Sequence, residues 1–195
     1  MSFIRNIFAI IGVLAVIGVL AATPYMLEVR SKFAEFDEKA VETYLDMFNK
    51  ILETGNAAEA TVWKTQVSED LSIEDVEETI RFVANEHNIM NVGELPLYRQ
   101  VQAMSGEPYR FVKIYMFCNA LTAAQMLEYS DAYSAYLPCR LSLVEDKQGK
   151  MWIYTLNMDP MIHGGKPLPP DLKAEALKVK EIMLDVLARG ASGDF

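Results

Sequence analysis

Apolar and polar residues alternate most regularly between residues 111 and 157. The first alternating run, FVKIYMFC, predicts a strand. Its two faces hold Val112, Ile114, Met116 and Cys118 on one side and Phe111, Lys113, Tyr115 and Phe117 on the other. A helix opened by Thr122 follows. Pro138 then returns the chain to extended structure, because proline disfavours helical geometry in the residue before it.

The second alternating run begins at the other cysteine. Cys139, Leu141 and Leu143 share one strand face, residues 146–149 (Asp-Lys-Gln-Gly) are typical of a turn, and residues 151–157 form a returning strand. The centre of the chain is therefore predicted as strand, helix, strand, turn, strand. The two cysteines of the sequence stand at two of its joints.

The N-terminus shows no alternation. Residues 7–27 carry no charge, and 21 helical residues at about 1.5 Å each would span the roughly 30 Å hydrocarbon core of a bilayer. A cleaved secretory signal is the alternative, since Arg5 and Val19-Leu20-Ala21 fit one loosely. The uninterrupted apolar length and Pro24 favour an uncleaved transmembrane anchor at residues 1–28.

Residues 29–56 are predicted to form an amphipathic stalk helix that ends at Gly55. Its apolar positions are Val41, Tyr44, Leu45, Phe48, Ile51 and Leu52. We expect this stripe to pack on the core of the following domain, with packing on another subunit as the alternative. Only Pro24 interrupts helix-compatible sequence from residue 3 to residue 54, so anchor and stalk can form one kinked helix.

The remaining elements complete one domain at residues 57–190, followed by a tail at 191–195. Residues 61–67 read as a strand, Ser72 opens a helix with a capping box, and residues 95–104 are expected to hold a short strand. A last helix runs from Asp171 to Gly190. Interleaved strands and helices without a parallel crossover series predict an α+β fold with an antiparallel sheet packed by helices.

Charge limits the partners. Of the 18 Lys and Arg residues only Arg5 precedes the apolar segment, so 17 basic residues stand against 27 acidic ones beyond it. Such a surface repels phosphate backbones and argues against nucleic acid. Membrane lipid is the expected partner of the anchor, and a protein partner or a second copy is expected through anchor and stalk. Basic residues flank the span on both sides. We expect a single-pass protein of a bacterial cytoplasmic membrane with its domain on the periplasmic side.

Particular motifs resemble a known family. The run Phe117-Cys118-Asn119-Ala120, the later Leu137-Pro138-Cys139, and the hairpin that ends in Asn157-Met158-Asp159-Pro160 are similar to the domain of unknown function 302 family. Ala120 departs from the proline usual there. The resemblance covers about residues 61–187. It implies a small α+β fold with a curved antiparallel sheet, often dimeric, and no established activity.

Cys118 and Cys139 are the main chemical candidates. Two thiols brought together can form a redox disulfide or hold a soft metal ion. Buried free cysteines otherwise behave as small hydrophobic residues, and both lie on apolar strand faces. The resemblance strengthens the functional interpretation, because both cysteines occupy motif positions of the family.

Met158, Met161 and His163 form a second cluster in the sequence MDPMIH. Thioether and imidazole groups at short spacing suit a copper-like ion, and the cysteines join them if the hairpin returns nearby. The candidate metal ligands are therefore Cys118, Cys139, Met158, Met161 and His163, with a soft metal ion as the cofactor. The alternative is a methionine-rich loop folded onto the core.

Signatures of common enzymes are absent from the sequence: there is no nucleophile elbow, zinc-protease helix, phosphate-binding loop or dinucleotide fingerprint. The acidic clusters at residues 35–38, 69–70 and 77–78 look like solvated faces. The sequence predicts a membrane-anchored, non-catalytic binding or accessory module, as in a subunit of an envelope membrane complex. The alternative is a thiol-redox or soft-metal binding protein.

Overall fold

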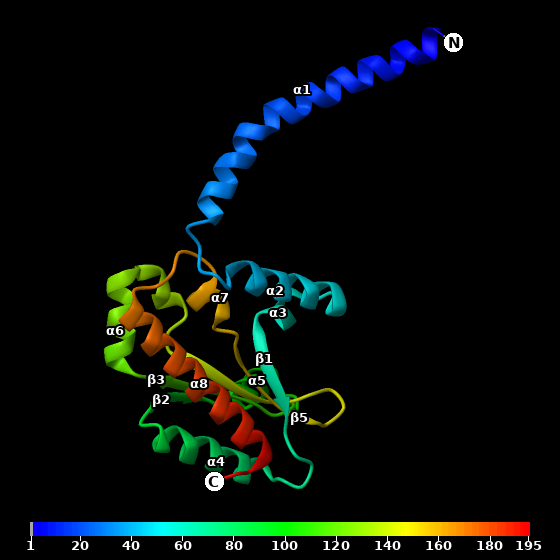
Figure 1. Ribbon diagram of the computed structural model, residues 1–195. Helices are drawn as coiled ribbons and strands as arrows, with labels where there is room; N and C mark the ends of the chain where they lie inside the picture. Colours follow the sequence, from blue (N-terminus) through cyan, green and yellow to red (C-terminus); the bar gives the residue numbers. More distant parts are fainter. Residues whose placement is uncertain (1) are drawn as a thin grey trace.

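The computed structural model describes residues 2–195, with side chains from Asn6 onward, so the side chain of Arg5 lies outside the described residues. Its strands are β1 (Val62–Gln66), β2 (Met90–Leu95), β3 (Val112–Cys118), β4 (Cys139–Glu145) and β5 (Met151–Leu156). They form one sheet in the order β1-β5-β4-β3-β2, with every neighbouring pair antiparallel (Figure 1). The α+β class and the central strand–helix–strand–turn–strand unit are confirmed.

Two long helices cover one face of this sheet: α4 (Ile73–Glu86) and α8 (Pro170–Ser192). Shorter helices join the strands at the sheet ends. They are α3 (Ala57–Ala60), α5 (Leu97–Ser105), α6 (Ala120–Tyr129), the 3-10 helix η1 (Asp131–Ala135) and α7 (Asp159–His163). The capping box at Ser72 is confirmed: its hydroxyl accepts from the N–H of Asp75, and the Asp75 carboxylate accepts from the N–H of Ser72.

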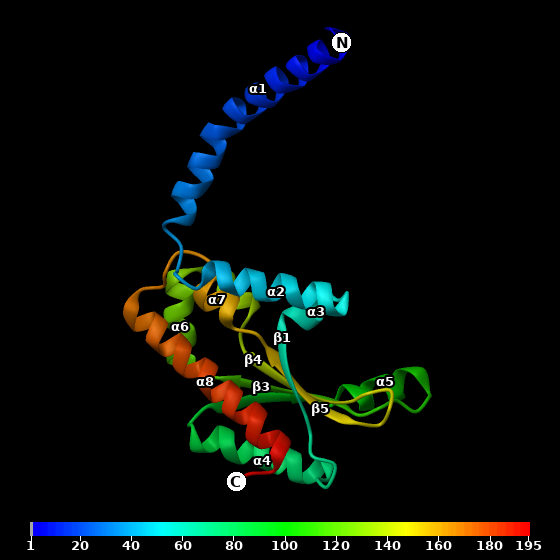
Figure 2. The same cartoon turned by 45° about the vertical axis from the view of Figure 1, so that its right-hand side comes forward.

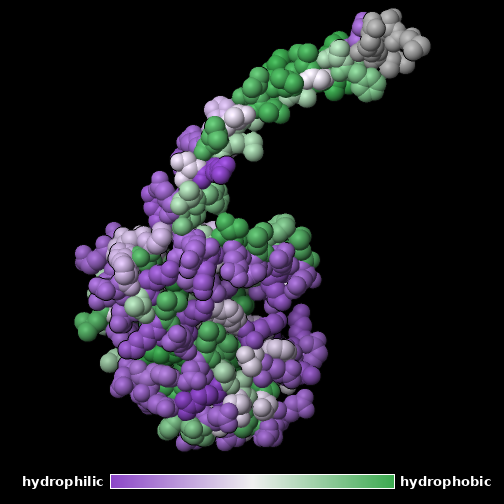
Figure 3. Space-filling model, viewed as in Figure 1, coloured by the Kyte–Doolittle hydropathy of each residue, from purple (hydrophilic) through white to green (hydrophobic). Residues whose placement is uncertain are grey.

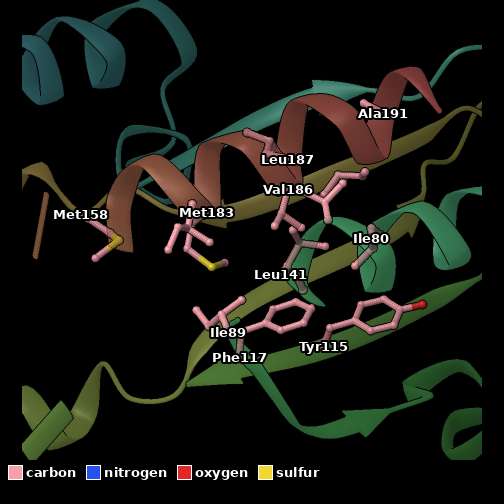
Figure 4. Close-up of a cluster of buried hydrophobic side chains, with 14 of the residues drawn as sticks. Ile80, Ile89, Tyr115, Phe117, Leu141, Met158, Met183, Val186, Leu187 and Ala191 are labelled. Carbon is pink, nitrogen blue, oxygen red and sulfur yellow. The ribbon is translucent and has the colours of Figure 1, made fainter. Parts of the chain in front are cut away.

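The core lies between the sheet and the α4/α8 layer. Tyr115 and Phe117 project from β3 toward α8, with Leu141 of β4 and Val186 of α8 beside them (Figure 4). All four side chains are fully buried. Burying a side chain of this size stabilises a fold by about 1.5–3 kcal/mol. The covered face of β3 is therefore the one that carries Lys113, Tyr115 and Phe117.

The sequence predicts that the last helix ends at Gly190, and this prediction is wrong. The helix α8 continues to Ser192 and ends at Gly193, which has a left-handed φ of 80°. Gly190 lies inside the helix because a Cβ there would approach Ile80 Cγ1 to 2.9 Å and Ile153 Cδ1 to 3.1 Å. This glycine is a contact point between α8, α4 and β5.

The predicted strand within residues 95–104 is wrong. Leu97, Val101 and Met104 follow helical spacing in α5, and the strand lies just before it, in β2. The pattern of β2 was hidden because its register shifts between Asn91 and Gly93. A bulge of this kind breaks the period-2 alternation by which strands are recognised.

The N-terminal part forms two helices, α1 (Ser2–Phe33) and α2 (Ala40–Thr54). In α1, residues 6–33 are long and apolar enough to cross a membrane. An 18-residue window within them has a mean hydropathy of 2.5, and none of that window is buried. Anchor and stalk are not one helix, because residues 34–39 turn the chain. Figures 1 and 2 both show α1 rising from one end of the domain and α2 lying across that same end.

The apolar stripe of α2 is not packed on the domain core, contrary to the sequence-based expectation. Only Ala40 and Thr43 of this helix are buried. The six apolar side chains of the stripe are between 36% and 68% exposed: Val41, Tyr44, Leu45, Phe48, Ile51 and Leu52. Figure 3 shows hydrophobic side chains at this end of the domain, near the foot of α1.

Candidate functional site

Five sulfur-bearing side chains line one small cavity at an end of the sheet, and four of them are predicted metal ligands. Cys118 is the last residue of β3, Cys139 is the first residue of β4, Met158 follows β5, and Met161 lies in α7. The cavity has a volume of about 40 Å³, a few times the roughly 10–15 Å³ that is needed to hold one water. The other lining side chains are mostly apolar or aromatic, and include Phe117, Met126, Tyr133 and Val179. The space fits a single ion or another very small ligand.

Local sequence explains why the two cysteines lie at the same end of the sheet. The strands β3 and β4 are antiparallel neighbours with Phe117 opposite Cys139, so Cys118 is offset by one register position. Between them Asn119 caps α6, its side chain accepting from the N–H groups of Leu121 and Thr122. Ala120 is the first residue of that helix, a position that also accepts proline. The departure from the family pattern therefore leaves the turn intact.

The walls of the cavity are tied together by side-chain hydrogen bonds. The Tyr133 hydroxyl in η1 donates to the carbonyl of Met161 at 3.0 Å. The Thr122 hydroxyl in α6 lies 3.3 Å from Glu175 Oε2 in α8, to which it donates. These contacts join the segment between the two cysteines to α7 and α8. Four separate elements besides the sheet therefore line the cavity.

The thiols are free, and Cys139 is a weak acid. Burial raises the pKa of the Cys139 thiol to about 11, and the nearby Cys118 raises it further. A thiol of this kind stays protonated at neutral pH and is a poor nucleophile, since the thiolate is the reactive form. A coordinated metal ion deprotonates a thiol outright. The protonated state of Cys139 therefore argues against covalent catalysis at this thiol.

His163 does not join the sulfur side chains. It is 4% exposed, and its Nδ1–H donates to Asp37 Oδ1 at 3.0 Å. Its surroundings are a polar cavity of about 170 Å³ that Asp159 and Lys180 also line. Four of the five predicted ligands are grouped, and the fifth lies elsewhere. Within residues 2–195, no cluster of three or more His, Cys, Asp or Glu side chains suits a metal ion.

Asp37 is a buried functional group that the sequence did not reveal. The acidic cluster at 35–38 was expected to be a solvated face, yet Asp37 is 4% exposed. Its carboxylate accepts from His163, from Lys173 and from the N–H of Lys39. Burial works to raise the pKa of Asp37, but these donors, Lys173 foremost, lower it to about 2. The ionised carboxylate is therefore a fixed part of the fold.

A second unrecognised network lies on the covered face of β3. Glu77 was also expected on a solvated face, but it accepts from Tyr115 and pairs with Lys113 at 2.8 Å. Lys113 also pairs with Glu94 at 2.7 Å. Hydrogen bonds from Arg81 lower the pKa of Glu94 to about 2. A lysine on the buried face of a strand was the available signal, because such a charge needs a carboxylate partner.

Fold and cavity together define a class: an α+β domain with a cavity at one end of its sheet, joined to a long apolar helix. The chain matches the family described as Domain of unknown function DUF302 over residues 63–190, more than half of its length. It belongs to the DUF302 family, and the resemblance read from its motifs is confirmed.

A solved structure shares the fold. The crystal structure of an uncharacterized conserved DUF302 protein from Bacillus stearothermophilus is similar with a TM-score of 0.54 and 17% sequence identity. The similarity covers 66% of this chain and 97% of that chain. No curated protein matches this chain.

Proposed function

We propose that the protein is a membrane-tethered, non-catalytic binding module, with α1 as a single-pass anchor and the DUF302 domain as the part that binds. The apolar helix carries the proposal. No residue in the most apolar 18-residue stretch of α1 is buried, so in water the whole surface of this stretch would be exposed. Exposed apolar area costs about 25 cal/mol per Å², and a patch of this size on a soluble domain marks a contact with membrane or protein.

The tether is tested by washing membranes that contain the full chain. We expect the protein to stay in the membrane fraction after alkaline and high-salt washes. A variant with Leu14→Arg and Ile17→Arg should move to the soluble fraction, because each mid-span charge costs about 2.5–3.5 kcal/mol of insertion. Met104→Arg, which adds a charge at an exposed position of α5, is the matched control. Release of the unmodified chain by the alkaline wash would refute the anchor.

An accessory role in an envelope complex is part of this proposal. Extraction in a mild detergent followed by sizing should give a particle larger than one chain in its detergent micelle. A lone monomer would contradict the accessory role, but it would not contradict the membrane tether. Protease added to intact spheroplasts should digest the domain if it lies on the periplasmic side, and protection would place it on the other side.

The sulfur-lined cavity favours a second candidate function, the binding of one soft monovalent metal ion. Thiolate and thioether groups select copper(I) over the harder divalent ions. Cys118, Cys139, Met158 and Met161 supply four such groups around a space of about 40 Å³. The mostly apolar lining would shield the bound ion from water. Ligation would displace the proton of Cys139.

Copper(I) titration of the full chain in detergent, against a competing chelator, tests this site. We expect one ion per chain, an affinity that rises with pH because binding releases protons, and at least about tenfold weaker binding for Cys139→Ser or Met161→Leu. The control is Met104→Leu, since Met104 is 89% exposed on α5. If His163→Gln abolished copper(I) binding and Met161→Leu did not, the cavity would be excluded as the binding site.

Thiol redox chemistry at the same cysteines gives a different result in that assay. A mild oxidant without metal would then remove both free thiols of a single chain, and Met161→Leu would have no effect. Metal binding and thiol oxidation are therefore distinguished by whether Met161→Leu changes the result.

A further inference from the structure

The amphipathic helix α2 has three distinct sides. Successive residues turn by about 100° around a helix, so Ala40 and Thr43 share the side that is buried on the domain. Val41, Leu45 and Phe48 point to another side, which is exposed and turned largely away from the buried one. The third side is polar. Its members are Glu42, Asp46, Asn49 and Glu53.

The junction between α1 and α2 is bonded to the domain. Residues 34–39 can bridge at most about 20 Å. The N–H of Asp37 donates to the carbonyl of Gly165 at 2.8 Å. The carboxylate of Asp37 accepts from His163 and Lys173, and Lys166 pairs with Glu35. The junction is therefore a fixed part of the domain surface, and it holds the foot of α1 beside the start of α2.

This geometry sets where a bilayer would lie. With residues 7–27 in the hydrocarbon layer, the charged turn at Glu28, Arg30 and Lys32 would occupy the headgroup region. The end of the domain that carries α2 would then face the membrane. In both ribbon views α2 lies across that end rather than along α1 (Figures 1 and 2). A helix in this position would be roughly parallel to the bilayer surface.

We propose that α2 is an interfacial helix whose exposed apolar stripe inserts into the headgroup–acyl boundary of the bilayer that α1 spans. The inference rests on the proposed membrane tether and adds a second contact that fixes the orientation of the domain. Amphipathic helices with aromatic and leucine side chains on one face bind membranes in this way. Phe48 supplies the aromatic group here, whereas the hydroxyl of Tyr44 donates to the carbonyl of Gly164 and ties α2 to the domain.

Charge indicates the kind of lipid contact. The helix carries Glu42, Asp46 and Glu53 against Lys50, so it is net acidic. Anionic headgroups would repel this face. The contact is therefore hydrophobic, it forms on zwitterionic phosphatidylcholine, and it does not weaken when salt is raised.

Photo-crosslinking of the full chain in phosphatidylcholine vesicles identifies the occupant of the stripe. Benzoylphenylalanine replaces one residue at a time: Leu14 in α1, Leu45 on the apolar side of α2, or Asn49 on its polar side. We expect a mass increase of one phospholipid at Leu14 and at Leu45, unchanged in 1 M salt, and none at Asn49. Phe48→Glu should lower the yield of the lipid adduct at Leu45 by about tenfold or more, because it removes one aromatic side chain from the contact with the bilayer.

The outcomes separate the two proposals. No lipid adduct at Leu14 would overturn the tether itself. A lipid adduct at Leu14 with none at Leu45 would overturn only the interfacial helix. A crosslinked dimer at Leu45 would assign the stripe to a second copy, and an adduct with another protein, seen when native membranes replace vesicles, would assign it to a partner. Either of those results would also overturn the proposal.

Discussion

Replacing Asp37 with asparagine tests the bonded junction directly. The substitution Asp37→Asn keeps the size of the side chain and its capacity to accept from Lys39 and His163. It removes the negative charge that pairs with Lys173. The side chain of Lys173 is 27% exposed, so its ammonium group can recover some hydration. We therefore expect a moderate loss of stability rather than unfolding.

The magnitude follows from the pKa of Asp37. The difference between an ordinary value of 3.8 and the folded value of about 2 corresponds to about 2 kcal/mol of folding free energy at neutral pH. Because the folded pKa is the lower one, this contribution is complete above pH 3.8. It is mostly lost as the pH falls to about 2, where the unfolded carboxyl group is protonated and the folded one is half protonated.

Urea unfolding of the full chain in a nonionic detergent measures this difference, with the fluorescence of Trp63 and Trp152 as the probe. Asp37→Asn should lower the free energy of unfolding by about 2 kcal/mol at pH 7, and the two curves should converge near pH 2. Glu38→Gln, a neighbouring exposed carboxylate, is the control. The reasoning is refuted if Asp37→Asn behaves like Glu38→Gln at pH 7, or if its deficit persists unchanged at pH 2.

Three further predictions concern the domain. Gly190→Ala should destabilise it by about 1–3 kcal/mol through contact with Ile80, whereas Gly165→Ala, where the added methyl meets nothing within 4 Å, should be nearly neutral; equal thermal shifts would contradict this. Ser72→Ala should cost about 1 kcal/mol by removing the cap of α4, measured by urea unfolding, and an unchanged midpoint would count against the cap. Alkylation of Cys139, followed in the metal-free chain by mass spectrometry, should accelerate with pH up to about 11; a plateau near pH 8.5, the ordinary thiol range, would disprove the raised pKa.

Much of the fold is predictable because its signals are local. The strands around Phe117 and Leu141 show clear alternation, the Asp146 turn has the expected chemistry, and the last helix has a regular apolar stripe. β2 and α5 are not predictable in this way. The bulge at Asn91–Gly93 breaks the period of β2, and α5 has no buried residue that would mark a helical face.

The candidate site is predictable only in part. Cys118 and Cys139 were recognisable because they flank one helix between two neighbouring strands, and Met158 follows the next strand. The position of His163 outside the cavity could not be predicted, because its partner Asp37 lies 126 positions away in the sequence. Nothing near Asp37 in the sequence distinguishes it from the exposed acids on either side. Only the tertiary fold selects which carboxylate is buried.

The bonding of Asp37 also determines how mechanical tension enters the domain. A pull along α1 reaches a carboxylate whose partners are His163 in α7 and Lys173 in the first turn of α8. The tension is therefore delivered to the helical layer before it can travel along the chain through α2 and α3 to β1.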